Sequence, residues 1–116
     1  MVSQGGADVP EAIEIQLKKG ALELCVLALL SQHESYAYEI ASKLSNSIGM
    51  GEGTIYPLMR RLQNEHLVET YMVESSAGPS RKYYRLTEAG KASFSSQRSA
   101  WSSFSGAVQS ILGGVK

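Results

Sequence analysis

A glycine-rich junction, "SIGMGEGT" at residues 47–54, separates two stretches whose apolar residues recur at helical spacing. Glycine reaches positive φ at little cost, so Gly49 and Gly51 predict a tight turn between two short helices. The apolar residues that fall on one face are Ala37, Ile40, Ala41, Leu44 and Ile48 before the turn, and Ile55, Leu58, Met59 and Leu62 after it. The pattern therefore predicts a helix-turn-helix.

The boundaries of these two helices are less clear than their faces. Ser35 is predicted to be the N-cap of the first. For the second, Thr54 as N-cap would place Pro57 among positions whose amides lack an intrahelical partner. A start near Gly51 would instead put Pro57 where it must bend the helix. The sequence leaves both alternatives open.

An earlier helix is expected to end near Gln32. Asp8 and Glu11 have the spacing of a capping box, with Pro10 tolerated in the first turn, and residues 1–8 are expected to be flexible. The second half, "LELCVLALL", is apolar almost all round, which predicts burial on more than one side and hints at a dimer.

Two alternating aromatic and β-branched runs, "LVETYMV" and "RKYYRLT", predict a β-hairpin whose flexible turn is "ESSAGPS", with Gly78 and Pro79 shaping the tip. Thr87 then caps a last helix. We name the C-terminal stripe the residues that recur three or four positions apart along it: Phe94, Gln97, Trp101, Phe104, Val108 and Ile111. The expected fold is mostly α (α+β): a winged helix-turn-helix domain at residues 9–86 and a dimerisation helix at 87–116.

Composition excludes several classes of protein. The 116 residues have no formal net charge, but residues 1–40 hold two basic and six acidic side chains (net −4), whereas residues 41–116 hold nine and five (net +4). An anionic partner should therefore meet the second half. The single cysteine, Cys25, and the lack of a long apolar run favour a cytoplasmic protein with no membrane span. His33 and His66 have no partner pattern, so we assign no catalytic residue, metal or cofactor.

The order of elements is typical of a winged helix that places its third helix in a DNA major groove and its hairpin against phosphates. The alternatives are that Arg60 and Arg61 form a merely solvated face, that the module binds protein rather than DNA, or that the chain is a small hydrolase or transferase. A protein-binding module would need an apolar or acidic recognition face, whereas this one carries Arg60 and Asn64. A hydrolase or transferase would need a nucleophile paired with a base, and no such pair is evident in the sequence. The predicted DNA-binding residues are Tyr38, Ser42, Lys43, Gly53, Thr54, Tyr56, Pro57, Arg60, Arg61, Asn64, Gly78, Arg81 and Lys82.

The first and last helices are expected to build a homodimer that recognises a pseudo-palindromic operator. The residues predicted to line that interface are Leu17, Ala21, Leu24, Phe94, Gln97, Trp101, Phe104 and Val108. Serines around Trp101 leave space for a small planar aromatic effector that would weaken DNA binding. The alternative is that two indoles pack on each other and leave no slot.

Three motifs, "SYAYEI", "GEGTIYPLMRRL" and "GPSRKYYRLTEAG", resemble in order and spacing those of the PadR-like transcriptional regulators. The resemblance covers about residues 11–112. It implies a bacterial homodimeric repressor, released by a small aromatic or cationic compound or a drug. The family's recognition helix falls on 52–65, its wing on 74–82 and its dimer helix on 87–112, and Trp101 takes the place of a tryptophan that stacks on planar ligands in some members. Arg98 and Ser105 depart from the aromatic or acidic pore residues of some relatives, which argues against large cationic drugs.

Overall fold

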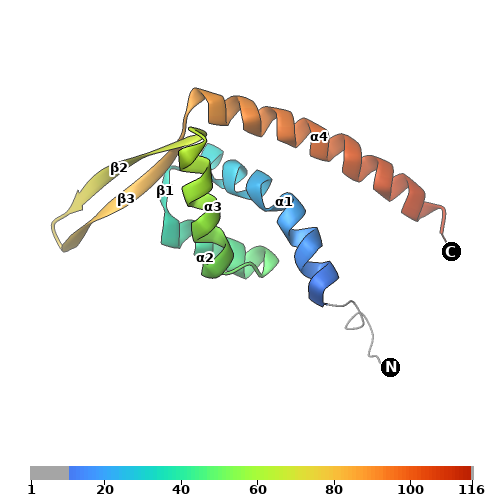
Figure 1. Ribbon diagram of the computed structural model, residues 1–116, viewed down its shortest axis with the longest axis horizontal. Coiled ribbons are helices and arrows are strands. Elements are labelled where there is room, and N and C mark those ends of the chain that lie inside the picture. The colour runs from blue at the N-terminus through green and yellow to red at the C-terminus, as the bar shows by residue number, and fades with distance from the viewer. Residues whose placement is uncertain (1–10, 116) are drawn as a thin grey trace.

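The computed structural model describes residues 11–115, and side chains from residue 16 onward. The elements, in chain order, are α1 (Glu11–Gln32), β1 (Ser35–Tyr36), α2 (Ala37–Ile48), α3 (Glu52–Asn64), β2 (Val68–Ser75), β3 (Gly78–Leu86) and α4 (Glu88–Gly113) (Figure 1). The predicted winged helix-turn-helix with a long last helix is confirmed. The predicted capping box at Asp8 and the flexible residues 1–8 lie outside the described residues.

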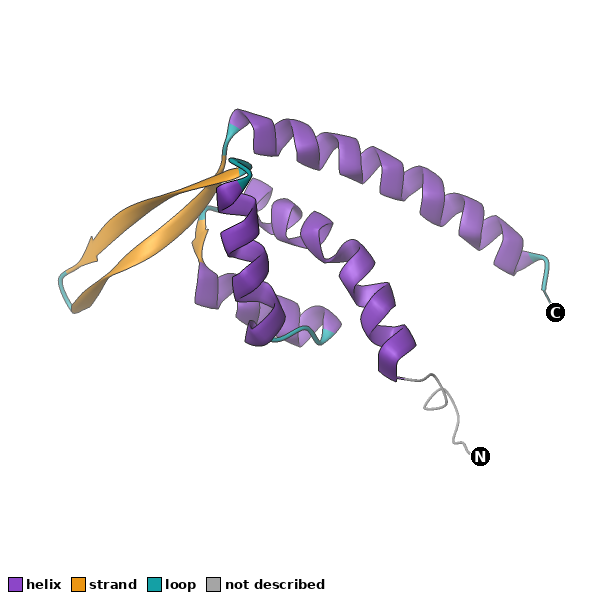
Figure 2. Cartoon of the chain, in the orientation of Figure 1, coloured by secondary structure: helices purple, strands orange, loops and turns teal. Residues whose placement is uncertain are grey.

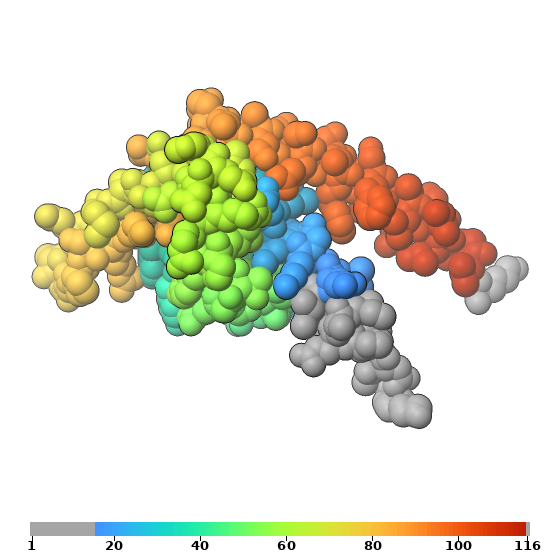
Figure 3. Space-filling view, viewed as in Figure 1, coloured from blue at the N-terminus to red at the C-terminus, as the bar shows by residue number. Residues whose placement is uncertain are grey.

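The molecule is elongated, with principal extents of 57 × 32 × 21 Å. Helices α1, α2 and α3 pack together in the middle, the β2–β3 hairpin projects on one side, and α4 runs away on the other (Figure 2). The space-filling view shows both projections standing clear of the helical centre (Figure 3). The hairpin tip and the far half of α4 are therefore available for contacts outside the chain.

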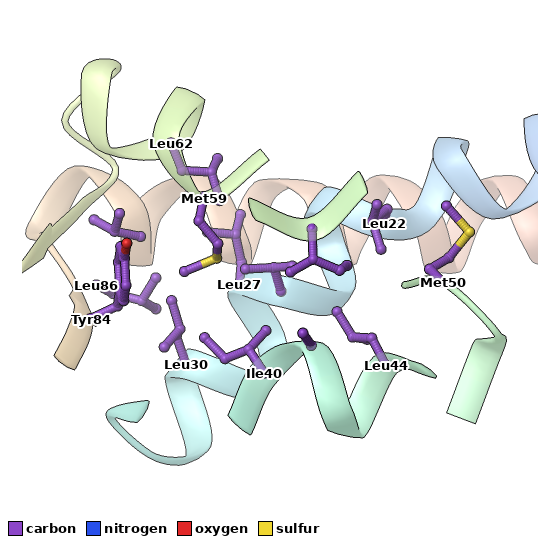
Figure 4. Close-up of a cluster of buried hydrophobic side chains, with 14 residues drawn as sticks. Leu22, Leu27, Leu30, Ile40, Leu44, Met50, Met59, Leu62, Tyr84 and Leu86 are labelled. Atoms are coloured by element: carbon purple, nitrogen blue, oxygen red, sulfur yellow. The ribbon is translucent and has the colours of Figure 1, made fainter. Parts of the chain in front are cut away.

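The core forms around α1, whose buried side chains meet those of α2, α3 and β3 (Figure 4). The apolar faces predicted for α2 and α3 are confirmed: their central residues are buried, and Ala37, Ile48 and Leu58 pack partly buried against the same cluster. Its buried members are Leu22, Val26, Leu27, Leu30, Ile40, Ala41, Leu44, Met50, Ile55, Met59, Leu62, Val68, Tyr84 and Leu86. Within this chain α1 is not covered all round, because Leu24, Cys25 and Leu29 are only half-buried.

The turn between α2 and α3 uses glycine at one position. Gly49 ends α2 with φ of 71°, and its amide donates to the Ser45 carbonyl at 3.1 Å. Gly51 is the N-cap of α3 in an extended conformation, so α3 begins before Thr54 and Pro57 lies inside it. The earlier of the two predicted starts is the observed one. Proline has no N–H, so the Gly53 carbonyl lacks its usual helical partner.

The predicted role of Ser35 as N-cap is wrong. Tyr36 occupies the N-cap without a side-chain cap, while Ser35 is buried in β1, where it pairs with Tyr84 of β3. The wing is therefore a three-stranded antiparallel sheet in the order β1-β3-β2. Its pairing also brings the rings of Tyr36 and Tyr83 together, with centroids 5.5 Å apart and planes tilted by 59°. This long-range pairing overrides the local capping preference of serine.

The predicted wing tip is also wrong. Ser75 pairs with Gly78, so the turn consists of Ser76 and Ala77, and both Gly78 and Pro79 belong to β3. The Ser75 hydroxyl accepts from the Ala77 amide at 3.2 Å, which stabilises the turn without a glycine at positive φ. Pro79 is tolerated because β1 pairs with β3 only at Tyr83 and Tyr84, which leaves that edge open at the proline.

Helix α4 begins as predicted. The Thr87 Oγ1 accepts from the Gly90 amide at 3.0 Å and donates to the His66 carbonyl at 2.7 Å. The Thr87 amide donates to the Leu67 carbonyl at 3.1 Å. Thr87 therefore ties the start of α4 to the junction between α3 and β2.

Replacing Gly90 by alanine should destabilise the fold, because a Cβ there would lie 1.9 Å from the Leu67 carbonyl oxygen. We expect a loss of about 3 kcal/mol in the free energy of unfolding, measured by urea denaturation. Gly106, in the same helix, is the matched control because its Cβ would meet nothing within 4 Å. Gly106→Ala should stabilise by about 0.5–1 kcal/mol. Equal effects at the two glycines would contradict the observed junction.

Candidate nucleic-acid interface

Helix α3 turns one face into the core and the other to solvent. Its exposed face carries Gly53, Pro57, Arg60 and Asn64, opposite the buried Ile55, Met59 and Leu62. The guanidinium of Arg60 makes no hydrogen bond, ion pair or ring contact with any residue of the described chain. A long cation without an internal partner is therefore available to an external anion or acceptor.

Tyr56 stands on the flank of this face that turns toward α2. It is half-buried, and burial together with the nearby Glu52 carboxylate raises its pKa. Its hydroxyl consequently stays protonated and can donate a hydrogen bond. Glu52, which the sequence analysis did not weigh, places one negative charge in the first turn of α3.

The predicted residues of α2 reach the same side of the molecule. Tyr38 is 60% exposed. Tyr38 and Ser42 line a hollow of about 240 Å³ together with Gly51 and Glu52 from the start of α3. Lys43 is exposed but lies outside this hollow. The structure thus brings Tyr38 and Ser42 up to the first turn of α3.

Arg61 and Thr54 lie on the other flank of α3, which faces α1. The Arg61 Nη2 is 2.5 Å from Glu23 Oε1, and its Nη1 is 3.0 Å from Glu65 Oε2. These hydrogen bonds raise the pKa of Arg61. Thr54 is half-buried in a hollow beside it. Arg61 lies on a different flank from Arg60, because neighbouring residues of a helix point about 100° apart, and the carboxylates of Glu23 and Glu65 are paired with it. The DNA-binding role predicted for Arg61 stays a prediction.

The two wing cations, Arg81 and Lys82, follow each other in β3 and so point to opposite faces of the sheet. The Arg81 guanidinium carbon lies 4.5 Å from the centroid of the Tyr36 ring, and the Lys82 Nζ lies 5.8 Å from that of Tyr84. Both residues line a hollow of about 390 Å³ at the first turn of α2. The wing cations therefore border a helix N-terminus, where unpaired amides favour an anion.

Arg85 is held differently from these two cations. Its Nε lies 2.8 Å from Glu69 Oε2, and its guanidinium carbon lies 5.0 Å from the centroid of the Tyr71 ring. The Tyr71 hydroxyl is bonded to the Glu34 carboxylate at 2.5 Å, which raises the pKa of Tyr71. Arg85 is consequently compensated by a carboxylate within the sheet, although its side chain is 46% exposed.

Tyr36 and the N-terminus of α2 are the parts of this surface that the sequence analysis missed. The signal was present in the paired aromatic runs "SYAY" and "RKYY", whose alternation matches two neighbouring strands. The assignment of Ser35 to a helix cap concealed it. Gly78, a predicted wing residue, is exposed near the hairpin turn and away from α2.

A second surface lies between α1 and α4. The start of the C-terminal stripe packs within the chain: Phe94 joins the core cluster, and Gln97 Nε2 donates to Glu23 Oε2 at 2.7 Å. Trp101 and Phe104 are 47% and 65% exposed. A hollow of about 260 Å³ separates the helices there and is lined by Gly20, Leu24, Gln97, Ala100, Trp101 and Phe104. Of the other predicted residues, Leu17 is exposed and Ala21 and Val108 are half-buried.

Other chemistries find little support in the described part of the chain. No three histidine, cysteine, aspartate or glutamate side chains among residues 16–115 gather in a way that could hold a metal ion. No described helix combines the length and apolar character needed to span a bilayer. Cys25 is half-buried, and burial raises the pKa of its thiol.

Comparison with known proteins places these surfaces in context. The family model described as "Transcriptional regulator PadR-like family" matches residues 26–96. A crystal structure of a PadR-like transcriptional regulator from Bacillus cereus is 40% identical, with a TM-score of 0.79 over 85% of this chain and 98% of the other. One from Eggerthella lenta is 27% identical, with a TM-score of 0.79 over 95% and 96%.

Two further relatives complete the comparison. A protein of Lysinibacillus sphaericus is 31% identical over 102 residues, which cover 84% of this chain and 94% of that protein. Bacillus subtilis PadR, whose structure was solved in complex with operator DNA, is 24% identical, with a TM-score of 0.58 over 66% of this chain and 45% of the other. At that identity the likeness concerns the fold alone.

Proposed function

The chain belongs to the PadR-like family of transcriptional regulators, and on this premise we propose that it binds double-stranded operator DNA as a homodimeric repressor. The observation that carries the proposal is Arg60 on the exposed face of α3, one helical turn after Tyr56 and without a partner in the described part of the chain. Residues 9–86 act as the DNA-binding domain, and residues 87–116 act as the dimerisation helix.

In this arrangement α3 enters the major groove. Arg60 and Asn64 reach base edges or phosphates, and Tyr56 packs on the backbone and donates its hydroxyl. Gly53 and Pro57 add no long side chain, so the helix can approach the groove closely. Tyr38 and Ser42 of α2 contact the flanking backbone, with Lys43 beyond them.

Phosphates on either side of the groove meet the wing. The hollow formed by Tyr36, Tyr38, Arg81 and Lys82 opens at the N-terminus of α2, where the first amides have no side-chain cap. Such amides suit a phosphate group, and Arg81 and Lys82 at the rim of the hollow can each approach a phosphate from its own face of the wing. A gel-shift of the purified protein against the DNA upstream of its own reading frame tests the function, and lack of any specific shift there and on selected random duplexes would overturn it.

Arg60→Ala should weaken operator binding by about 1–3 kcal/mol and relax specificity at one base pair if Arg60 reads a base. If it grips phosphate, affinity for all sequences should fall alike and the salt dependence should become shallower. Fluorescence anisotropy with operator and scrambled duplexes distinguishes the two. Arg85→Ala is the control, because Arg85 is already paired with Glu69. Wild-type affinity in both Arg60→Ala and Tyr56→Ala would rule out α3 as the reading helix.

Replacing Arg81 and Lys82 together by alanine should flatten the slope of log K against log salt by roughly 2, because two phosphate contacts disappear. Titrations at several salt concentrations measure this slope. Lys91→Ala, which removes an exposed cation at the start of α4, should leave the slope unchanged. A double variant with the wild-type slope would mean that the wing points away from DNA.

The apolar residues left exposed on α4 support the homodimer. Besides Trp101 and Phe104 they are Ile111 and Leu112, with Val115 just after the helix, and Leu17 of α1 is 70% exposed. We expect two chains to bury these residues about a two-fold axis, with half-sites about one helical turn apart on the operator. Phe104→Ser combined with Ile111→Ser should raise the dimer dissociation constant at least about tenfold in analytical ultracentrifugation. Met72→Ser, on the wing, is the control, and an intact protein that sediments as a monomer at micromolar concentration would contradict the dimer.

A small planar aromatic effector fits the hollow at Trp101, where an indole and a phenyl ring border about 260 Å³. Its binding would release the operator, with a coupling of about 1–3 kcal/mol typical of such systems. The single tryptophan makes this measurable, because flavins, phenolic acids or planar dyes should quench its fluorescence and raise the dissociation constant for DNA together. Quenching without release, or no quenching by any of them, would mean that the rings pack on each other and leave no slot.

A further inference from the structure

The carboxylate of Glu23, near the middle of α1, is shared between two other helices. Its Oε1 accepts from Arg61 Nη2 of α3 at 2.5 Å, and its Oε2 accepts from Gln97 Nε2 of α4 at 2.7 Å. Each oxygen therefore serves one helix. A single side chain links the helix proposed to read DNA with the helix proposed to form the dimer.

The link is held in a defined geometry. The Glu23 side chain is only 26% exposed. Burial by itself raises the pKa of Glu23, but the hydrogen bonds from Arg61 and Gln97 outweigh it and the pKa is lowered, so the carboxylate is charged near neutral pH. Both partners are also tied to their own helices: Arg61 to Glu65 at 3.0 Å, and Gln97 to Ser93 at 3.0 Å.

Gln97 stands between two hollows. One, of about 260 Å³, contains Trp101 and Phe104. The other, of about 510 Å³, is lined by Thr54, Pro57 and Arg61 of α3 as well as residues of α1. Trp101 follows Gln97 by one helical turn, so the two side chains lie on one face of α4. A change in the spacing of α1 and α4 at Trp101 must therefore move the Gln97 amide relative to Glu23.

We propose that Glu23 and Gln97 are positioning residues that couple the packing of α4 at Trp101 to the orientation of the DNA-reading helix α3. The inference rests on the proposed function and names the route by which that function is regulated. When α4 shifts, the hydrogen bond from Gln97 to Glu23 breaks or changes its geometry. The Glu23 carboxylate then moves relative to Arg61, and α3 is no longer held at the angle that fits the groove. Such coupling requires an element with two arrangements whose balance both sites can shift. Here the element is the link through Glu23, and the sites are the hollow at Trp101 and the exposed face of α3.

The first test needs no DNA. Amide hydrogen exchange of the intact protein should show residues 58–64 of α3 exchanging about 5-fold or more faster in Gln97→Ala and Glu23→Gln, with the hairpin unchanged. The double variant should be no faster than either single one, because both remove the same link. The inference would be overturned if α3 exchanges at the wild-type rate in these folded variants, or if the effects of the two single variants add fully in the double variant. The proposal that the protein binds DNA would still stand.

The second test uses Trp101 as the reporter and a duplex selected by gel-shift from the upstream DNA. Operator binding should change Trp101 emission in the wild-type protein. Gln97→Ala and Glu23→Gln should bind the duplex more weakly, because α3 is less well held, and should lack that change even when saturated with duplex. Glu65→Gln is the matched control, because it removes the other carboxylate at Arg61 and keeps the link to α4. The coupling would be overturned if the wild-type protein binds DNA with no change in Trp101 emission, or if Gln97→Ala and Glu23→Gln keep that change. Absence of any DNA binding would instead overturn the proposed function itself.

Discussion

Burial of the apolar side of α1 is the interaction on which the rest of the structure depends. Val26 and Leu27 are fully enclosed, and Leu22 and Leu30 nearly so, by side chains from α2, α3 and β3. Each such side chain contributes about 1.5–3 kcal/mol when it is removed from water. The helix-turn-helix and the sheet are therefore held in place by a helix that lies outside both.

This core decides which surfaces are left over. With Ile55, Met59 and Leu62 buried in the core cluster, the opposite side of α3 faces solvent, and Arg60 stands there without a partner among the described residues. Helix α4 is anchored at Thr87 and Gly90 and follows α1 only as far as the hollow at Trp101. Beyond that point Phe104, Ile111 and Leu112 of α4 are exposed in the described part of the chain. The same packing thus leaves a polar face on α3 and an exposed apolar stretch on α4, which are the two surfaces on which the proposed function rests.

The basic side chains of the molecule also differ in whether a carboxylate compensates them. Arg61 and Arg85 are paired with carboxylates, whereas Arg60 has no carboxylate partner among the described side chains. Arg81 packs over Tyr36 and Lys82 over Tyr84, one on each face of the wing. The net positive charge of residues 41–116 is consequently less informative than the positions of these side chains, because compensated cations contribute little to the field that a DNA phosphate meets.

The sequence by itself determined the elements and their faces. Apolar spacing on α2 and α3, the glycine at the end of α2, the cap at Thr87 and the alternation in the hairpin are local properties, and each lies where the pattern predicts it. The tertiary structure decided what depends on residues far apart in the chain. Ser35 belongs to a strand because Tyr84 lies opposite it, and Arg61 is paired with a carboxylate because Glu23, 38 positions earlier, lies on its flank of α3. The spacing of residues along the sequence determines on which side of a helix or strand a side chain lies. Which distant group it contacts there depends on the tertiary packing.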